Sequence, residues 1–396
     1  MGALDIEGCF THCRTHCAQN GCDYVCPSKL DDFIVSFFEV GGFDDVCDYP
    51  VTGPIVERLP IYIPNILHGS GRIVPFDRKV LAVPLYKFVH HQGKQYGSFV
   101  RTAEELRSLF QIDAKAEIIV ISSGPDQNLE NFWEHFEAER VVDALLPLGI
   151  SGITIPNFSY FLDAPRTEIL YNFRRMMIVM EAFARAGLPT IPHINAITPQ
   201  DWDDWFSFLK DQPAISCVAM EFQTGLRQPS RGRPMLEQLK KLQDRLGRSI
   251  HPLLIGGGGY AQDARQALGK YSLVDAMPFM KSFKRHRLKQ NGSASSGWEQ
   301  APTEIGAPID HLLAYNVLEY EVRLLRKMGV GFDIDRRQML LAISPSNIPA
   351  NRRSVSKLRS HNGLVAGRGQ DLSAWPDIPT LKLTAQPVIL GSNSIN

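Results

Sequence analysis

Cysteine is nearly absent from most of this chain. Of the 7 cysteines in 396 residues, only Cys217 lies beyond residue 47. A framework of disulfide bonds spread along the chain is therefore excluded. Long hydrophobic runs are missing too, since no apolar stretch approaches the roughly 20 residues that cross a bilayer. No hydrophobic signal stretch opens the chain, so we expect a cytoplasmic protein without a membrane partner.

An excess of charge of one sign is also missing. Lys and Arg together number 42, as do Asp and Glu, and the net charge is +0, so the molecule as a whole is not a polycation. The hydrophobic fraction of 44% and the charged fraction of 21% are those of an ordinary globular protein with room for one large domain. Basic side chains still cluster in residues 281–289 and 351–368. These segments either contact phosphates or form solvated surface.

Cysteine is instead concentrated at the front of the chain, with the spacing C-x3-C-x3-C-x4-C-x3-C-P. Grouped thiolates suit zinc or an iron–sulfur cluster, and His12 and His16 add possible nitrogen ligands. A proline after the last cysteine also occurs at ferredoxin-type clusters, which favours iron–sulfur slightly over zinc. Disulfides and free thiols are the alternatives. The predicted metal ligands are Cys9, Cys13, Cys17, Cys22, Cys26 and Cys47.

A rhythm of short apolar runs and longer amphipathic stretches begins near residue 60. Each run is rich in Val and Ile, as strands buried on both faces are. The predicted strands are residues 61–67, 80–85, 117–122, 152–156, 190–194, 216–222, 252–255 and 273–277. The predicted helices between and after them are residues 102–110, 131–146, 167–186, 199–210, 234–246, 262–268 and 309–328.

Eight strand–helix units predict an α/β fold of the (β/α)8 TIM-barrel type. A doubly wound open sheet is the alternative, but no G-x-G-x-x-G follows the first strand. We expect a Cys-rich metal-binding segment at residues 1–50, the barrel at 51–330, and a basic, loop-rich C-terminal extension at 331–396.

Polar side chains follow the strands, where the active face of such a barrel lies. Asn and Gln offer a donor and an acceptor together and match the edge of a planar heterocycle. A run of glycines lets the backbone approach a ligand closely. The residues predicted to bind a base are Ser123, Asn157, Ser159, His193, Asn195, Glu221, Gln223, Gly256, Gly257 and Gly258. Helix capping or burial would explain each of them singly, and the prediction depends on several strand ends agreeing.

The segment LLIGGGGYAQDARQALGKYSLVDAMPFMKSFKRHRLKQNG, residues 253–292, resembles the signature of tRNA-guanine transglycosylases, a superfamily that includes relatives acting on deazaguanine in DNA. In that family a Gly-rich turn and a short helix precede a strand bearing an aspartate nucleophile, and a basic segment follows. The loops at residues 122–125, 157–160 and 221–225 are similar in order to the family's other site loops. The resemblance covers roughly residues 60–330 and departs from the family after the barrel, where the family's zinc-binding cysteines are missing.

The resemblance implies exchange of a purine or deazapurine base for a guanine in DNA or tRNA. Asp275 would be the carboxylate nucleophile, and Asp126 or Asp163 would assist proton transfer. The flanking phosphates would contact Lys281, Lys284, Arg285 and Arg287. Two rival functions stay open: a barrel enzyme of another reaction class that uses an iron–sulfur cluster, and a non-catalytic nucleic-acid-binding subunit of a larger assembly of proteins.

Overall fold

The computed structural model describes residues 30–43, 50–54, 58–160, 166–289, 297–301, 303–304 and 306–330. The six predicted cysteine ligands, Asp163 and the predicted C-terminal extension lie outside these residues. The chain divides into two units, Met1–Ser344 and Pro345–Asn396, and all described residues belong to the first.

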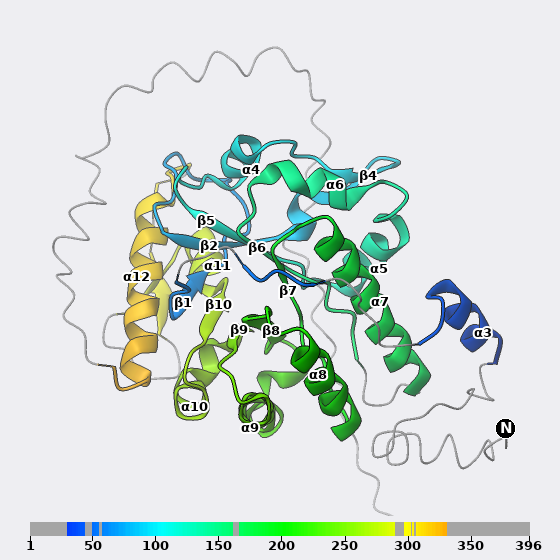
Figure 1. Ribbon diagram of the computed structural model, residues 1–396. Coiled ribbons are helices and arrows are strands. Elements are labelled where there is room, and N and C mark those ends of the chain that lie inside the picture. Colours follow the sequence, from blue (N-terminus) through cyan, green and yellow to red (C-terminus); the bar gives the residue numbers. More distant parts are fainter. Residues whose placement is uncertain are drawn as a thin grey trace, which may run out of the picture. The chain divides into compact units, whose positions relative to one another are not determined.

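Two four-stranded parallel sheets form the centre of the first unit (Figure 1), with the strand orders β1-β10-β9-β8 and β2-β5-β6-β7. The strands are short and almost entirely buried, which explains their continuous apolar sequences. Each overlaps one of the eight strands predicted from the sequence. Their bounds are β1 (Tyr62–Pro64), β2 (Val80–Pro84), β5 (Glu117–Ile121), β6 (Gly152–Thr154), β7 (Thr190–Ile191), β8 (Cys217–Glu221), β9 (His251–Ile255) and β10 (Ser272–Asp275).

Single parallel bridges connect the two sheets at both ends. Asn65, directly after β1, pairs with Ala82 of β2, and His193, after β7, pairs with Ala219 of β8. The Ile66 N–H donates to the Ala82 carbonyl at 2.8 Å, and the Ile194 N–H donates to the Ala219 carbonyl at 2.8 Å. The order of neighbours therefore returns to its starting strand, and we propose that the strands close into an eight-stranded barrel with two short seams.

Alternate residues of the strands belong to two separate hydrophobic clusters, which supports this proposal. One cluster contains Ile63, Val80, Ala82, Ile119, Ile121, Ile191, Cys217, Ala219, Leu253, Ile255 and Val274, all from strands. Their strand neighbours, such as Tyr62, Leu81 and Leu273, pack with the helices in the other cluster. Because side chains alternate between the faces of a strand, the first cluster would fill the interior of the proposed barrel.

Helices lie outside the strands (Figure 1). Their bounds are α3 (Leu30–Glu39), α4 (Ala103–Phe110), α5 (Asp126–His135), α6 (Val141–Leu145), α7 (Arg166–Arg185), α8 (Pro199–Asp211), α9 (Pro229–Leu246), α10 (Ala261–Ala267), α11 (Met277–Phe283) and α12 (Asp310–Lys327). No helix among the described residues has both the length and the apolar character needed to cross a membrane.

Two helix predictions were wrong. The amphipathic stretch 131–146 is not one helix, because α5 ends at His135 and Arg140 adopts a left-handed conformation, with φ at 50°, before α6. The helix predicted to begin at Pro234 begins at Pro229, so Pro234 lies inside α9. Two antiparallel hairpins were also missed, one of β3 (Val89–Gln92) with β4 (Gln95–Ser98) and one of β11 (His286–Leu288) with β12 (Trp298–Gln300).

A capping box fixes the segment between β7 and α8. The Thr198 side chain accepts from the Asp201 N–H at 3.1 Å, and the Asp201 carboxylate accepts from the N–H groups of Ile197 and Thr198 at 2.8 Å each. The Trp205 indole then donates to the Asn195 carbonyl at 2.8 Å. The bond to Thr198 satisfies one free N–H group of the first helical turn, and the other bonds hold residues 195–198 in place.

Replacing Thr198 by Ala should lower the free energy of unfolding by about 1 kcal/mol, because the cap bond to the Asp201 N–H is lost. Urea unfolding of the full chain followed by circular dichroism measures this. Thr198→Ser, which keeps the hydroxyl, is the matched control and should stay near the wild type. Equal losses in both variants would mean that the methyl group, and not the cap bond, matters.

Candidate functional site

The inward-facing series of three strands continues past the apolar cluster into polar residues. Two positions beyond Ile121 on β5 comes Ser123, and two positions beyond Ile191 on β7 comes His193. On β8 the residue two positions after Ala219 is Glu221. The same alternation that buries Ile and Ala below therefore turns these three polar side chains toward the space between the strand ends.

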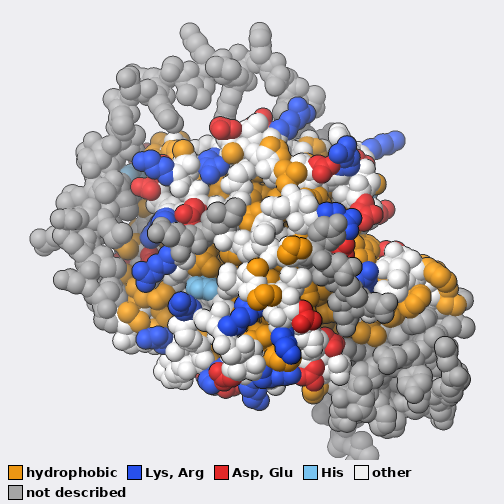
Figure 2. Space-filling view, in the orientation of Figure 1, with side chains coloured by type: hydrophobic (Ala, Val, Ile, Leu, Met, Phe, Trp, Pro, Cys, Tyr) orange, Lys and Arg blue, Asp and Glu red, His pale blue; other side chains and the backbone are white. Residues whose placement is uncertain are grey.

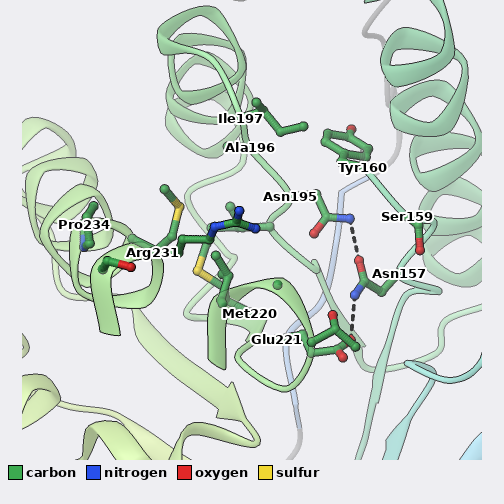
Figure 3. Close-up of a pocket in the computed structure, with 16 residues that line it drawn as sticks. Asn157, Ser159, Tyr160, Asn195, Ala196, Ile197, Met220, Glu221, Arg231 and Pro234 are labelled. Atoms are coloured by element: carbon green, nitrogen blue, oxygen red, sulfur yellow. Dashed lines mark hydrogen bonds between the residues drawn. The ribbon is translucent and has the colours of Figure 1, made fainter. Parts of the chain in front are cut away.

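Glu221 is held by a network of neutral side chains (Figure 3). Its Oε2 accepts from Asn157 Nδ2 at 2.8 Å, and it also takes a hydrogen bond from Ser123. Asn195 Nδ2 donates both to Asn157 Oδ1 and, at 2.9 Å, to the Phe158 carbonyl. Residues after three strands, β6, β7 and β8, thus form one connected chain of amide and carboxylate groups.

Burial raises the pKa of the Glu221 carboxyl, and the charge of Asp126 raises it further. The hydrogen bonds from Asn157 and Ser123 lower it, but they do not cancel the cost of burial. Asp126, in the first turn of α5, accepts from Ser159 Oγ at 2.5 Å and is itself exposed. A half-buried carboxyl with a raised pKa next to an exposed carboxylate is an arrangement suited to proton transfer.

A cavity of about 680 Å³ lies beside this network. That volume is within the usual range for a site that binds a small molecule. Figure 3 shows Arg231 on the opposite side of the cavity from Asn157 and Glu221. The lining residues are Asn157, Ser159, Tyr160, Ile194, Asn195, Ala196, Ile197, Met220, Glu221, Thr224, Gly225, Leu226, Ser230, Arg231, Pro234 and Met235.

The first turn of α9 forms one wall of the cavity. Pro229 is the first residue of this 18-residue helix, and Ser230 and Arg231 follow it. The helix dipole makes such a turn electropositive, and Arg231 adds a full charge. The cavity therefore has a carboxylate and amides on one side and a positive helix end on the other.

His193 is completely buried, and burial lowers its pKa to about 3. Its Nδ1 lies 3.5 Å from Ser123 Oγ, while Nε2 has no hydrogen-bond partner within the described residues. The ring is therefore neutral near pH 7 and adds no charge beside Glu221. It links β7 to the Ser123 hydroxyl that in turn contacts the carboxyl.

Asp275, the predicted nucleophile, faces α12. Its Oδ2 accepts from the Tyr320 hydroxyl at 2.6 Å and its Oδ1 accepts from the Met277 N–H at 2.8 Å. Burial raises the pKa of Asp275, and these donors lower it. Its predecessor Val274 points inward, so the pleat turns Asp275 outward. The role of nucleophile stays a prediction, and the geometry instead gives Asp275 the task of anchoring α12.

The glycines predicted to bind a base are positions of close packing. A Cβ on Gly257 would lie 2.7 Å from Leu254 Cβ, and one on Gly258 would lie 2.8 Å from Asp275 Oδ2. Gly256 has a left-handed backbone, with φ at 71°, and lies against the side chain of Gln223. These residues bring the turn after β9 against its neighbours, and the cavity lies against other residues.

Two cations of the predicted phosphate-binding segment have partners within the chain. Arg287 pairs with Glu299 at 2.6 Å, and Arg285 donates to the Ala307 carbonyl. Lys281 Nζ lies 5.9 Å from the centre of the Trp298 ring, while Lys284 is exposed. Their contact with phosphates stays a prediction, which the geometry favours more for the lysines than for the arginines.

The structure joins four of the predicted base-binding residues directly at the cavity: Asn157, Ser159, Asn195 and Glu221. Ser123 and His193 support them from the inner side, and Asp126 is bonded to Ser159. The sequence did not indicate Arg231. Pro234 predicts a helix start, and this prediction puts the first turn of α9, with Arg231, outside the helix. The sequence also did not indicate Tyr320, for which a tyrosine within a long amphipathic helix gave no signal.

Comparison with known proteins gives little support for a family. No family model matches the chain, and no solved structure matches it. Tetracycline repressor protein class C from Escherichia coli is 29% identical over 128 residues, which are 32% of this chain and 55% of the repressor. The chain thus matches about half the length of this curated relative. The resemblance to tRNA-guanine transglycosylases was wrong as an identification, because no model of that family matches and the similarity found is to a repressor.

Metal binding cannot be followed to its predicted ligands, which all lie outside the described residues. Within the part of the chain that the structure describes, no group of three or more His, Cys, Asp or Glu side chains is placed to hold a metal ion. Iron–sulfur or zinc at the cysteines stays a prediction.

Lowering the pH should destabilise the protein through His193. His193 binds a proton near pH 6.5 in the unfolded chain but only near pH 3 in the folded chain. The folded state therefore loses stability as the pH falls from 6.5 toward 3. The free energy of unfolding should fall by about 1.4 kcal/mol per pH unit for this residue. His193→Gln should show a shallower pH dependence in urea unfolding from pH 7 to about pH 5. The exposed His91→Gln is the control, and an equally shallow curve for it would contradict the assignment.

Proposed function

We propose that this protein binds a nucleotide unit of a nucleic acid in the cavity and exchanges its base. The observation that carries the proposal is Glu221, an inward carboxyl with a raised pKa, fixed by amides on one side of a cavity whose other side is a positive helix end. The base would lie at Glu221 and the phosphate at Arg231.

Hydrogen bonding favours a base edge rich in donors, such as the N1 and N2 edge of guanine. Glu221 has carboxylate lone pairs beyond those that Asn157 and Ser123 use. The amide nitrogen of Asn195 donates to Asn157 and to the Phe158 carbonyl, and Figure 3 shows the amide oxygen turned toward the cavity. Two acceptors thus face the ligand, and Tyr160 and Met220 supply apolar surface for the ring.

The opposite wall suits the phosphate. The positive end of the α9 dipole and the Arg231 guanidinium would attract an anion, as helix N-termini commonly do. Ser230 adds a hydroxyl beside them. A sugar bridging the two walls would pass Ser159, the lining residue whose hydroxyl donates to Asp126.

Base exchange needs one carboxylate as nucleophile and one proton carrier. We put forward Asp126 as the nucleophile in place of Asp275. Asp126 is exposed, and the bond from Ser159 goes to its Oδ1, so Oδ2 would be the attacking oxygen. As its oxygen bonds to C1′, the C1′–N bond breaks and the leaving base takes a proton from Glu221. The incoming base then bonds to C1′, releases Asp126 and returns a proton to Glu221. The rise in the pKa of Glu221 supports its role as the proton carrier.

A nucleic acid as partner agrees with the name of the partly similar relative, a repressor protein. The same cavity would serve a binding subunit that recognises a base without changing it. Turnover separates these two functions. An iron–sulfur enzyme of another class depends on cysteines outside the described residues.

Binding of guanosine monophosphate to the full chain tests the cavity. Glu221→Gln should weaken binding of both the nucleotide and guanosine by about ten- to hundredfold, because the hydrogen bonds of the carboxyl group to the base are lost. Arg231→Ala should weaken the nucleotide by a similar factor and leave guanosine unchanged. Isothermal titration measures both. Loss of guanosine binding in Arg231→Ala, or none in Glu221→Gln, would contradict this placement.

Nucleoside mass spectrometry of total DNA and total tRNA tests the reaction. Cells expressing the wild type should contain a modified purine in one of the two pools, and Asp126→Asn and Glu221→Gln should abolish it. Asp275→Asn is the matched variant and should retain it. Loss in Asp275→Asn alone would return the nucleophile to Asp275. No modified purine with any variant or the wild type would rule out exchange and favour the binding subunit.

A further inference from the structure

An aromatic shelf lies at the ends of three neighbouring strands, β10, β1 and β2. In the order of neighbouring strands, β9 and β5 separate these three from β8, β7 and β6, which carry the network around Glu221. The shelf consists of His68, in the loop after β1, and Met280 and Phe283 on α11. Phe283 is 50% exposed and Met280 is 43% exposed. Because strands run parallel, these loops are at the same edge of the sheets as the cavity.

The rings of the shelf are fixed in position. The centre of the His68 ring is 4.7 Å from that of Phe283 and 4.8 Å from that of Phe279, at interplanar angles of 83° and 86°. Phe279 is buried, so α11 holds the pair from beneath. Packed edge-to-face, His68 supports Phe283 and leaves half of the latter's surface open to a partner.

The charges that act on His68 are positive. Burial, and after it the charges of Lys87 and Arg72, lower the pKa of His68 to about 4. Lys87 follows β2 and is exposed, as is Lys284, the residue after Phe283. In Figure 2, Lys and Arg side chains gather around a histidine and hydrophobic side chains where Figure 1 draws α11.

We propose that the shelf binds single-stranded nucleic acid, with a base stacked on Phe283 and neighbouring phosphates on Lys87 and Lys284. An exposed aromatic ring flanked by cations is the combination that single-strand-binding surfaces use. A protein or lipid partner would use the apolar surface but would not need both cations. The inference builds on the proposed function, because a strand resting on the shelf can cross the strand ends and present another nucleotide to the cavity.

Fluorescence anisotropy with labelled single-stranded and duplex oligonucleotides, of DNA and of RNA, tests the shelf on the full chain. Phe283→Ala should weaken single-strand binding about tenfold and leave its salt dependence unchanged. The double change Lys87→Ala and Lys284→Ala should reduce the slope of log affinity against log salt by about 1.4, since each phosphate contact contributes about 0.7. Phe283→Trp should keep wild-type affinity or exceed it, which a merely structural role would not predict.

Two controls match these variants. Phe38 on α3 is 76% exposed, and Lys115 precedes β5 at the opposite edge of the sheet, so Phe38→Ala and Lys115→Ala should bind as the wild type does. No single-strand binding by the wild type, or binding that Phe283→Ala leaves intact, would overturn the shelf. Equal binding of duplex and single strand would overturn the stacking.

The cavity and the shelf can fail separately. Phe283→Ala should bind guanosine monophosphate as tightly as the wild type, because the nucleotide alone reaches only the cavity. Shelf-dependent oligonucleotide binding without any binding of the nucleotide would uphold the shelf and contradict the proposed function. If Glu221→Gln abolishes nucleotide binding while Phe283→Ala leaves oligonucleotide binding unchanged, the cavity would be upheld and the shelf contradicted.

Discussion

Side-chain alternation along short parallel strands is the constraint on which the structure depends. Ile63, Ala82, Ala219 and Val274 fill the space between the strands, while their neighbours pack under the helices. The inner positions are small or branched because several strands share that space. Where a strand continues two residues beyond these apolar side chains, its next inward side chain lies at the carboxyl end of the strands, beside the cavity. The alternation along the strands therefore decides which polar residues can contact a ligand.

Glu221 and Asp275 show how strictly this rule sorts similar residues. Both are carboxylates at strand ends, and burial raises the pKa of each. Glu221 is two residues beyond an inner alanine and faces the cavity, whereas Asp275 directly follows an inner valine and faces Tyr320 of α12. Dipoles of Asn157 and Ser123 stabilise the charge of Glu221, and the neutral ring of His193 avoids a buried ion pair, which would be costly to desolvate.

The strands were predictable because apolar, β-branched runs of this length have few alternatives, and each of the eight has its counterpart in the structure. The base-binding loops were predictable in part, since Asn157, Asn195 and Glu221 all follow strands. Asp275 was predicted as the nucleophile from a resemblance in motif order, which does not reveal that the pleat of β10 turns this carboxylate toward Tyr320. Arg231 could not be predicted as part of a helix, because proline is commonest at the start of a helix and Pro234 therefore predicts a later start. The tolerance of Pro234 inside α9 depends on tertiary packing.

A chain of net charge +0 exerts little long-range attraction on a polyanion. Screening limits the reach of its individual cations to about 10 Å at ordinary ionic strength. Cations that serve recognition must therefore stand at the point of contact, as Arg231 does beside the cavity and Lys87 does beside the shelf. Much of the affinity must then come from contacts to the base itself: the carboxyl and amide groups that match a base edge, and rings on which a base can stack. The selectivity that we propose for a flexible, unpaired strand follows from that division, because a duplex hides base edges and ring faces and offers mainly its phosphates.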